Sequence, residues 1–148
     1  DLVGRKMPAN FGRNLRQFFH PVAGYLEAHQ HDQELAEFVG PLGKAFGRLQ
    51  QATGLIAQRG MARPDEAGAA ASEYLRLFGL VALAYLWARM AEIALKKTAA
   101  GEDSDGFYRH KLLTARFYFE RILPDAGALL AKIMAGSKTM MAFEEAAF

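Results

Sequence analysis

Three features of the sequence predict an all-α fold, an up-down-up-down four-helix bundle with long, partly kinked helices. Apolar residues recur at spacings of three and four in four successive blocks. Short segments with glycine, proline and capping residues separate the blocks, and no segment alternates apolar and polar residues as a half-buried strand does. Because short loops join long helices, sequential helices are expected to lie antiparallel.

The composition of the 148-residue chain suits one domain with a single core. It has no cysteine, which removes disulfides and thiolate chemistry and suits a cytoplasmic protein. Its 18 basic residues face 16 acidic ones, a balance that gives little support to a nucleic-acid partner. The longest uncharged run, residues 77–88, is shorter than the roughly 20 residues that cross a bilayer, so we predict no transmembrane segment.

The first predicted helix begins after Asn10, whose side chain can cap it. Pro21 is expected to kink or split this helix near His20, because proline lacks the N–H that a helix interior uses. The apolar residues of its stripe are Phe11, Leu15, Phe18, Phe19, Val22 and Leu26.

The second helix is expected after Asp32, a plausible cap, with Pro41 as an internal kink. Its apolar residues are Leu35, Phe38, Val39, Leu42, Phe46, Leu49 and Ile56. Gly43, Gly47 and Gly54 share one stripe, which we interpret as a close approach to another helix. The stretch "GPLGKAFG" could also suggest a phosphate-binding loop around Lys44. Such a loop needs a Ser or Thr directly after the lysine and a β-strand before it, and both are missing.

The third helix is predicted to start at Pro64, with Asp65 and Glu66 where the helix dipole favours negative charge. It should run to about Ala100, and Gly101 should close it. Because its centre is apolar on nearly every side, it is expected to be the most buried of the four helices.

Trp87 lies in the apolar stretch of this third helix, with Leu80, Leu83 and Ala84. We therefore expect Trp87 to be buried at the centre of the bundle, where replacement by Ala would cost about 3–5 kcal/mol.

The fourth helix is expected to have Ser104 or Asp105 as its cap, a kink at Pro124 and an end at Gly136. Basic residues alternate with aromatic ones along it, a pattern that suits single-stranded nucleic acid but is more typical of an amphipathic helix. The basic residues are Arg109, Lys111, Arg116 and Arg121.

The histidines predict no metal site. Glu27 and His31 stand four apart, but a ferritin-like site would need a Glu-x-x-His pattern on two helices. His29 and His31 are better explained as cations favoured at a helix end. We therefore expect no metal ligand in this chain.

The tail after Gly136 is the least ordinary feature. It carries adaptable apolar side chains where a free terminus normally frays. We expect it to dock onto this bundle or onto a second subunit. The interface candidates are Met140, Met141, Phe143 and Phe148.

Four stretches resemble a bacterial branch of the flavin-dependent acyl-CoA dehydrogenases, which includes the enzymes of 3-methylthiopropionyl-CoA type. They are "DLVGRKM", "FGLVALAYLWARMAEIAL", "KLLTARFYFERILPDAGALLAKIMAG" and "TMMAFEEAAF". In that branch an Asp-Leu-x-x-Arg-Lys run follows a Tyr-Glu-Gly-Thr-Asn stretch. The residues that match the run are Asp1, Leu2, Arg5 and Lys6.

The resemblance implies an accessory C-terminal domain, with residues 1–8 as the tail of the catalytic domain and residues 9–148 as the helical bundle. The parent enzyme would use FAD to desaturate an acyl-CoA between its α and β carbons, and would pass electrons to an electron-transfer flavoprotein. Its proton-abstracting glutamate would lie upstream of Asp1, so this fragment alone is expected to be inactive and to bind no FAD. The expected partners are the catalytic domain of the same chain and further copies in a homo-oligomer.

Two alternatives stay open. A stand-alone helical module would use the Met/Phe tail to bind a partner outside any enzyme. A basic adaptor for nucleic acid or an anionic membrane would use the basic residues of the fourth helix, and its binding would weaken steeply with salt.

Overall fold

The computed structural model describes residues 1–6 and 12–144, and all regular elements within these ranges are helical. The α-helices are α1 (Arg13–His29), α2 (Ala36–Ala62), α3 (Pro64–Ala99), α4 (Phe107–Phe117) and α5 (Asp125–Ala135). Short helical turns form η1 (Leu2–Lys6), η3 (Tyr118–Ile122) and η4 (Met140–Ala142). The prediction of an all-α fold is confirmed.

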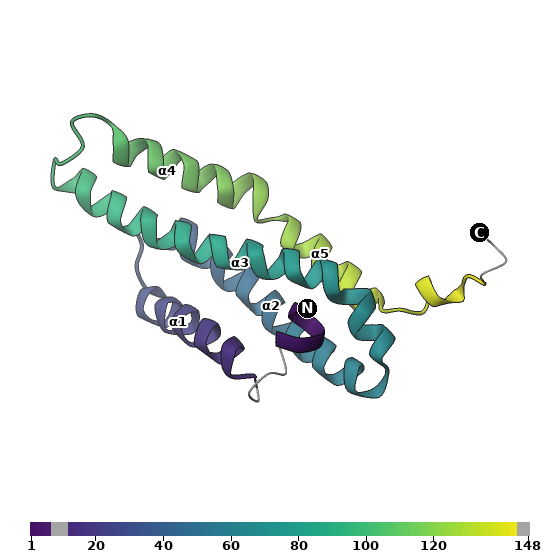
Figure 1. Ribbon diagram of the computed structural model, residues 1–148. Coiled ribbons are helices and arrows are strands. Elements are labelled where there is room, and N and C mark those ends of the chain that lie inside the picture. The colour runs from purple at the N-terminus through teal and green to yellow at the C-terminus, as the bar shows by residue number, and fades with distance from the viewer. Residues whose placement is uncertain (7–11, 145–148) are drawn as a thin grey trace.

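α3 is the central helix of the molecule. It contacts α2, α4, α5 and η1, and Figure 1 shows α2, α3 and the rod made of α4, η3 and α5 lying side by side, with α1 alongside. Each long helix runs back along the one before it (Figure 1). The largest fully buried side chains are Tyr74, Phe38, Leu35, Leu42, Leu49, Leu77, Val22 and Val81. Burial of each aliphatic one stabilises the fold by about 1.5–3 kcal/mol.

α1 runs through Pro21 as one helix, so the chain does not split near His20. The predicted cap, Asn10, and Phe11 lie outside the described residues. Only Val22 of α1 is fully buried, and stacked rings supply further contacts, including Phe18 on Phe78 of α3 with centroids 4.6 Å apart.

α2 likewise continues through Pro41, and it starts at Ala36. The prediction that Asp32 caps it is wrong, because Asp32 Oδ1 instead accepts a hydrogen bond from the N–H of Glu34 at 3.1 Å, inside the turn before the helix. Short polar side chains often bond the backbone two residues on in this way.

The close approach predicted for the glycine stripe of α2 is wrong at two of its three positions. A Cβ added at Gly47 or Gly54 would meet no neighbouring atom within 4 Å. At Gly43 it would lie 3.7 Å from Cδ2 of Leu26 on α1. Of these three glycines, only Gly43 therefore faces another helix.

The predicted boundaries of α3 are confirmed. Pro64 is its first residue, Asp65 and Glu66 are in its first turn, and it ends at Ala99. Gly101 follows with a φ of 73°, a left-handed conformation that glycine adopts without strain.

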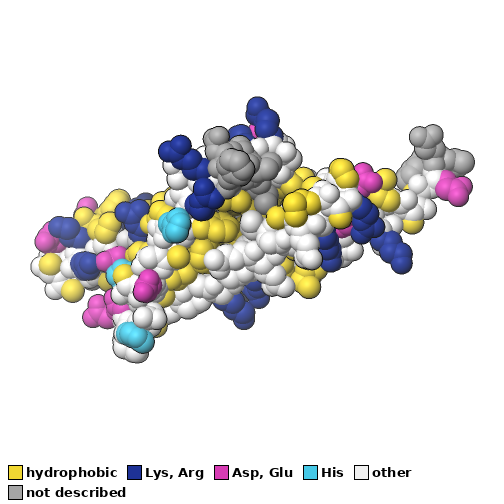
Figure 2. Space-filling model, turned by 90° about the horizontal axis from the view of Figure 1, so that it is seen from below, with side chains coloured by type: hydrophobic (Ala, Val, Ile, Leu, Met, Phe, Trp, Pro, Cys, Tyr) yellow, Lys and Arg dark blue, Asp and Glu magenta, His cyan; other side chains and the backbone are white. Residues whose placement is uncertain are grey.

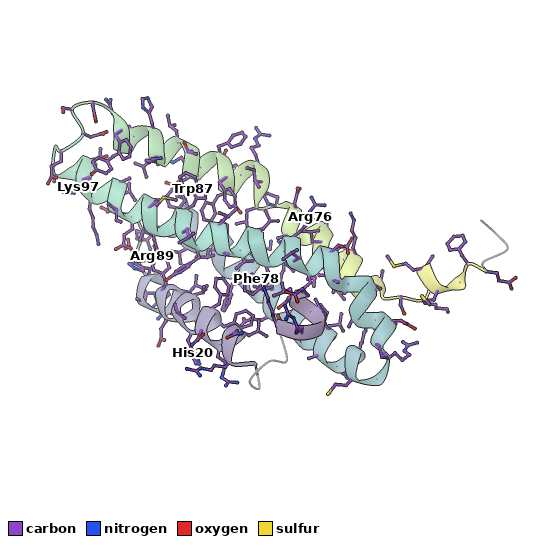
Figure 3. The ribbon with its side chains drawn as sticks, in the orientation of Figure 1. His20, Arg76, Phe78, Trp87, Arg89 and Lys97 are labelled. Carbon is purple, nitrogen blue, oxygen red and sulfur yellow. The ribbon has the colours of Figure 1, made fainter. Side chains whose placement is uncertain are left out.

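The expectation that α3 is the most buried helix is wrong, because its packed face covers only part of its circumference. Large apolar side chains of its opposite face are exposed, and Trp87 is half-buried against the edge of the core. Trp87 projects from α3 toward α4 (Figure 3). Of its expected neighbours, Ala84 is fully buried and Leu83 is 49% exposed.

α4 starts at Phe107, after Gly106 in a left-handed conformation with a φ of 77°. The prediction that Ser104 caps α4 is wrong. Asp103 accepts hydrogen bonds from the N–H groups of Tyr108 at 2.8 Å and Arg109 at 3.1 Å. Asp105, the other predicted cap, accepts one from Phe107 at 3.1 Å.

The rod made of α4, η3 and α5, called the fourth rod below, is interrupted near Pro124, where the sequence predicted a kink. A π-helical turn, η3, precedes Pro124. α5 then runs from Asp125 to Ala135 and is followed by Gly136, which has a φ of 73°. Tyr118 fixes η3 to α3, since its hydroxyl donates a 2.7 Å hydrogen bond to the carbonyl of Leu80. Burial raises the pKa of Tyr118 to about 12.

Candidate docking surfaces

The C-terminal tail leaves the helical body at the end of α5 and projects away from it (Figure 1). Of the interface candidates, Met140 is 60%, Met141 63% and Phe143 62% exposed. Phe148 lies outside the described residues. The same projection is visible from below in Figure 2. Met140 and Met141 thus remain available to a surface other than the bundle of their own chain.

The start of the tail is held by a buried carboxylate. Glu66, in the first turn of α3 and 5% exposed, accepts a 2.7 Å hydrogen bond from Oγ of Ser137. Nη2 of Arg63 lies 3.0 Å from Oε1 of Glu66, and Nη1 of Arg59 lies 3.9 Å from Oε2. Arg59 also donates to the carbonyl of Met134 at 3.0 Å. We call Arg59, Arg63, Glu66 and Ser137 the corner clamp, since their contacts fix the end of α5 to the corner between α2 and α3.

Gly136 completes the corner clamp. Its φ of 73° is left-handed, and a Cβ added there would lie 2.8 Å from Oε2 of Glu66. A larger residue would therefore both strain the backbone and collide with the buried carboxylate. The hydrogen bond from Ser137, reinforced by the charges of Arg63 and Arg59, lowers the pKa of Glu66, although its burial acts in the opposite direction.

The outer face of α3 is the second exposed apolar surface. Successive residues of this face are three, four or eight positions apart, so they lie on one side of the helix. They are Leu75 at 57% exposure, Leu83 at 49%, Leu86 at 47%, Met90 at 36% and Ile93 at 55%. Soluble domains usually cover a continuous apolar strip of this kind.

α3 is also the one helix in the described part of the chain that is long and apolar enough to cross a membrane. The length of the uncharged run, residues 77–88, underestimates how much of α3 is apolar enough to span a membrane, because a membrane-spanning segment can contain a few charged residues. Length and composition alone are weak evidence, since a core helix of a soluble protein meets the same criteria. The absence of a transmembrane segment stays a prediction.

Two of the four basic side chains of the fourth helix are paired within the chain. Arg116 of α4 binds both carboxylate oxygens of Glu37 of α2, at 2.9 to 3.2 Å, and Glu37 raises its pKa through this hydrogen bonding. Arg109 Nε lies 3.1 Å from Oδ2 of Asp103. This pairing reduces the positive charge available to a nucleic acid or an anionic membrane.

His29, at the end of α1, joins that helix to α3. Its Nδ1 lies 3.4 Å from Oδ2 of Asp32, and its Nε2 lies 3.5 Å from Oε2 of Glu92. Lys96 donates to the other oxygen of Glu92 at 2.6 Å. The neighbouring Tyr25 hydroxyl has its pKa raised by burial and by the charge of Glu92. His29 therefore serves as a link between helices.

Neither of two hollows beside α2 contains the parts of a reaction site. One, of about 450 Å³, lies between the end of α1 and the start of α2, and the other, of about 350 Å³, lies between α2 and η3. Their linings contain no nucleophile next to a base. Among the described residues, no three His, Asp or Glu side chains lie close enough together to hold a metal ion.

The geometry thus presents two uncovered apolar surfaces on a helical body. Residues 16–144 match the family described as "Acetyl-CoA dehydrogenase C-terminal like". The chain belongs to this family. It is therefore an accessory C-terminal domain of an acyl-CoA dehydrogenase. A search for relatives among curated proteins gave no match.

In this acyl-CoA dehydrogenase C-terminal domain, sequence reasoning found the tail but missed the corner clamp and the outer face of α3. Glu66 was recognised only as a charge in the first turn of a helix, because its partner, Ser137, is 71 residues away. The outer face could have been predicted from the sequence, because the centre of α3 has more apolar residues than one packed face of a helix can bury.

Proposed function

We propose that the domain supports the oligomer of an FAD-dependent acyl-CoA dehydrogenase of the 3-methylthiopropionyl-CoA type branch. One observation carries this proposal: a chain matching the family over residues 16–144 leaves both an apolar helix face and an apolar tail uncovered. These surfaces suit packing against other protein, since large uncovered apolar areas mark interaction sites. The four rods would act as an up-down-up-down bundle that holds the surfaces in place.

In the proposed enzyme, the catalytic work belongs to residues outside this domain. Residues 1–8 would form the tail of the catalytic domain, and the general base would be a glutamate preceding Asp1. The enzyme would be cytoplasmic and would remove a proton and a hydride from neighbouring carbons of an acyl-CoA. FAD would accept the hydride, and an electron-transfer flavoprotein would then accept the electrons.

The proposal is tested by comparing the 148-residue chain with the full-length protein. The full-length protein should be yellow from bound FAD and should reduce an artificial acceptor with an acyl-CoA, 3-methylthiopropionyl-CoA among those tried. The 148-residue chain should be colourless and inactive with FAD added. Turnover by the 148-residue chain alone would contradict the proposal, as would a full-length protein without flavin.

The stand-alone partner-binding module is the second candidate, favoured by the exposed Met140, Met141 and Phe143. It predicts that deleting residues 139–148 leaves the oligomeric state of the full-length protein unchanged. The enzyme-support proposal predicts that the same deletion weakens the oligomer.

A further inference from the structure

We infer that residues 139–144 in the tail of one copy dock onto the outer face of α3 of a second copy. The inference rests on the proposed role of the domain in an oligomer, and it names the surface that receives the tail. Three observations support it: the chemistry of the tail, the chemistry of the outer face, and the distance between them within one chain.

The two surfaces are chemically complementary. The tail combines exposed apolar side chains with two consecutive carboxylates, Glu144 and Glu145. The outer face of α3 is a strip of leucine, methionine and isoleucine. Basic residues accompany the strip on the same helix: Arg76, Arg89, Lys96 and Lys97. The tail is therefore apolar and acidic, and the outer face of α3 is apolar with basic residues beside it. Opposite charges of this kind help to orient two surfaces as they associate.

The basic residues extend along the whole strip. Figure 3 shows Arg76 and Lys97 far apart along α3, with Arg89 between them. Glu92 also lies on this helix, but it is engaged by His29 and Lys96. Lys96 is itself neutralised by Glu92, and Lys97 is paired with Glu102. The positive charge beside the outer face therefore comes from Arg76 and Arg89, opposite in sign to the charge of the tail.

The corner clamp prevents the tail from reaching most of its own outer face. Ser137 is bound to Glu66, so the tail starts beside residue 66 of α3. With a rise of 1.5 Å per residue, Leu86 to Ile93 lie roughly 30–40 Å farther along the helix. Even fully extended, residues 138–143 span at most about 20 Å. Met140, Met141 and Phe143 therefore cannot contact Leu86 to Ile93 of their own chain while the corner clamp is closed.

A second copy does not face this limit. Its tail projects from the end of its helical body (Figure 1), where it can be inserted against a neighbouring molecule. Exchange of tails between two copies would cover both apolar surfaces of each, and a closed pair of this kind satisfies two-fold symmetry.

The absence of native cysteine allows a direct test. Two differently tagged forms of the 148-residue chain, Met141→Cys and Leu86→Cys, are mixed and treated with a short bifunctional thiol cross-linker. We expect a cross-linked pair containing both tags. Met61→Cys, at an 86% exposed position on α2, replaces the tail cysteine as the matched control and should give at least tenfold less product.

A chain carrying both Met141→Cys and Leu86→Cys shows whether a tail docks onto its own helix. Cross-linking within one molecule, with no covalent pair, would overturn the inference. So would an equal yield from the Met61→Cys control.

A charge change provides the independent measurement. Leu86→Glu should abolish self-association in analytical ultracentrifugation, whereas Leu113→Glu, at a 60% exposed position on α4, should leave it intact. Circular dichroism checks that both variants fold. Unchanged association of Leu86→Glu, or a wild-type chain that remains monomeric at its highest soluble concentration, would overturn the inference. Flavin binding and turnover of the full-length enzyme test the proposed function separately from these results.

Discussion

Oγ of Ser137 donates a 2.7 Å hydrogen bond to Oε1 of Glu66, joining two residues that are 71 positions apart. One lies just after α5 and the other in the first turn of α3. The bond therefore closes the fourth rod onto the α2–α3 corner and sets the direction in which the tail leaves the molecule.

The corner clamp should make stability depend on acid pH. Since the pKa of Glu66 is lowered in the folded state, the clamp stabilises the fold above the ordinary glutamate pKa of about 4.3. That stabilisation is lost as the pH falls through the lowered pKa, because the carboxylate becomes protonated. Glu66→Gln should have a lower melting temperature than wild type at pH 7, and the difference should shrink below about pH 4. A difference independent of pH would show that the charge of Glu66 contributes nothing.

Gly136→Ala should be more destabilising than Gly101→Ala. Both glycines have a φ of 73°, where an alanine is strained. Gly136 also has a ψ of −167°, in a region that residues other than glycine hardly ever adopt. At Gly101 an added Cβ meets no atom within 4 Å, but at Gly136 it would lie 2.8 Å from Oε2 of Glu66. Urea unfolding compares the two variants, and the larger loss expected for Gly136→Ala combines its backbone strain with the collision. Equal losses would mean that neither of these two effects destabilises the fold.

Asp103→Ala should destabilise α4, whereas Ser104→Ala should have little effect. Asp103 accepts hydrogen bonds from the N–H groups of Tyr108 and Arg109, which have no partner inside the helix. Loss of such a cap typically costs about 0.5–2 kcal/mol. The free energy of unfolding from urea titration measures both changes. A larger loss for Ser104→Ala would restore the capping role predicted from the sequence.

Local chemistry made the ends of α3 and the break in the fourth rod predictable. Pro64 favours the first turn of a helix, and Gly101 and Gly136 permit the left-handed residue that ends one. The same local reasoning predicted Ser104 or Asp105 as the cap and missed Asp103, because any of these side chains can cap and the path of the loop decides which one reaches the helix.

Long-range packing could not be read from the sequence. α3 is apolar nearly all round, so its pattern does not reveal which side faces α2, and the packed side left Trp87 only half-buried. Pro21 does not split its helix, because Pro21 and Pro41 lie inside continuous helices, where tertiary contacts offset the lost hydrogen bond. The kinks at these two prolines stay predictions. The Glu66–Ser137 contact had no local signal at all.

Phe38→Ala should destabilise the domain more than Trp87→Ala. Phe38 is fully buried and packs edge-on against Phe119, with ring centroids 5.3 Å apart, so its removal should cost about 3–5 kcal/mol. Trp87 is half-buried, and its replacement leaves a smaller cavity. Chemical denaturation compares the two variants directly. An equal or larger loss at Trp87 would place that side chain in the core after all.

Deletion of residues 139–148 tests what the tail does. Because Met140, Met141 and Phe143 are exposed, the deletion should change the free energy of unfolding of a single 148-residue chain by less than about 0.5 kcal/mol, as for surface changes generally. In the full-length enzyme the deletion should weaken self-association, since each of these side chains gains roughly 1.5–3 kcal/mol if fully buried, before ordering costs are subtracted. Thermal unfolding at low protein concentration measures the first effect, and sedimentation velocity the second. A lowered melting temperature with unchanged association would show that the tail stabilises its own bundle. If association is unchanged and hydrogen exchange leaves the tail unprotected, the docking prediction is wrong.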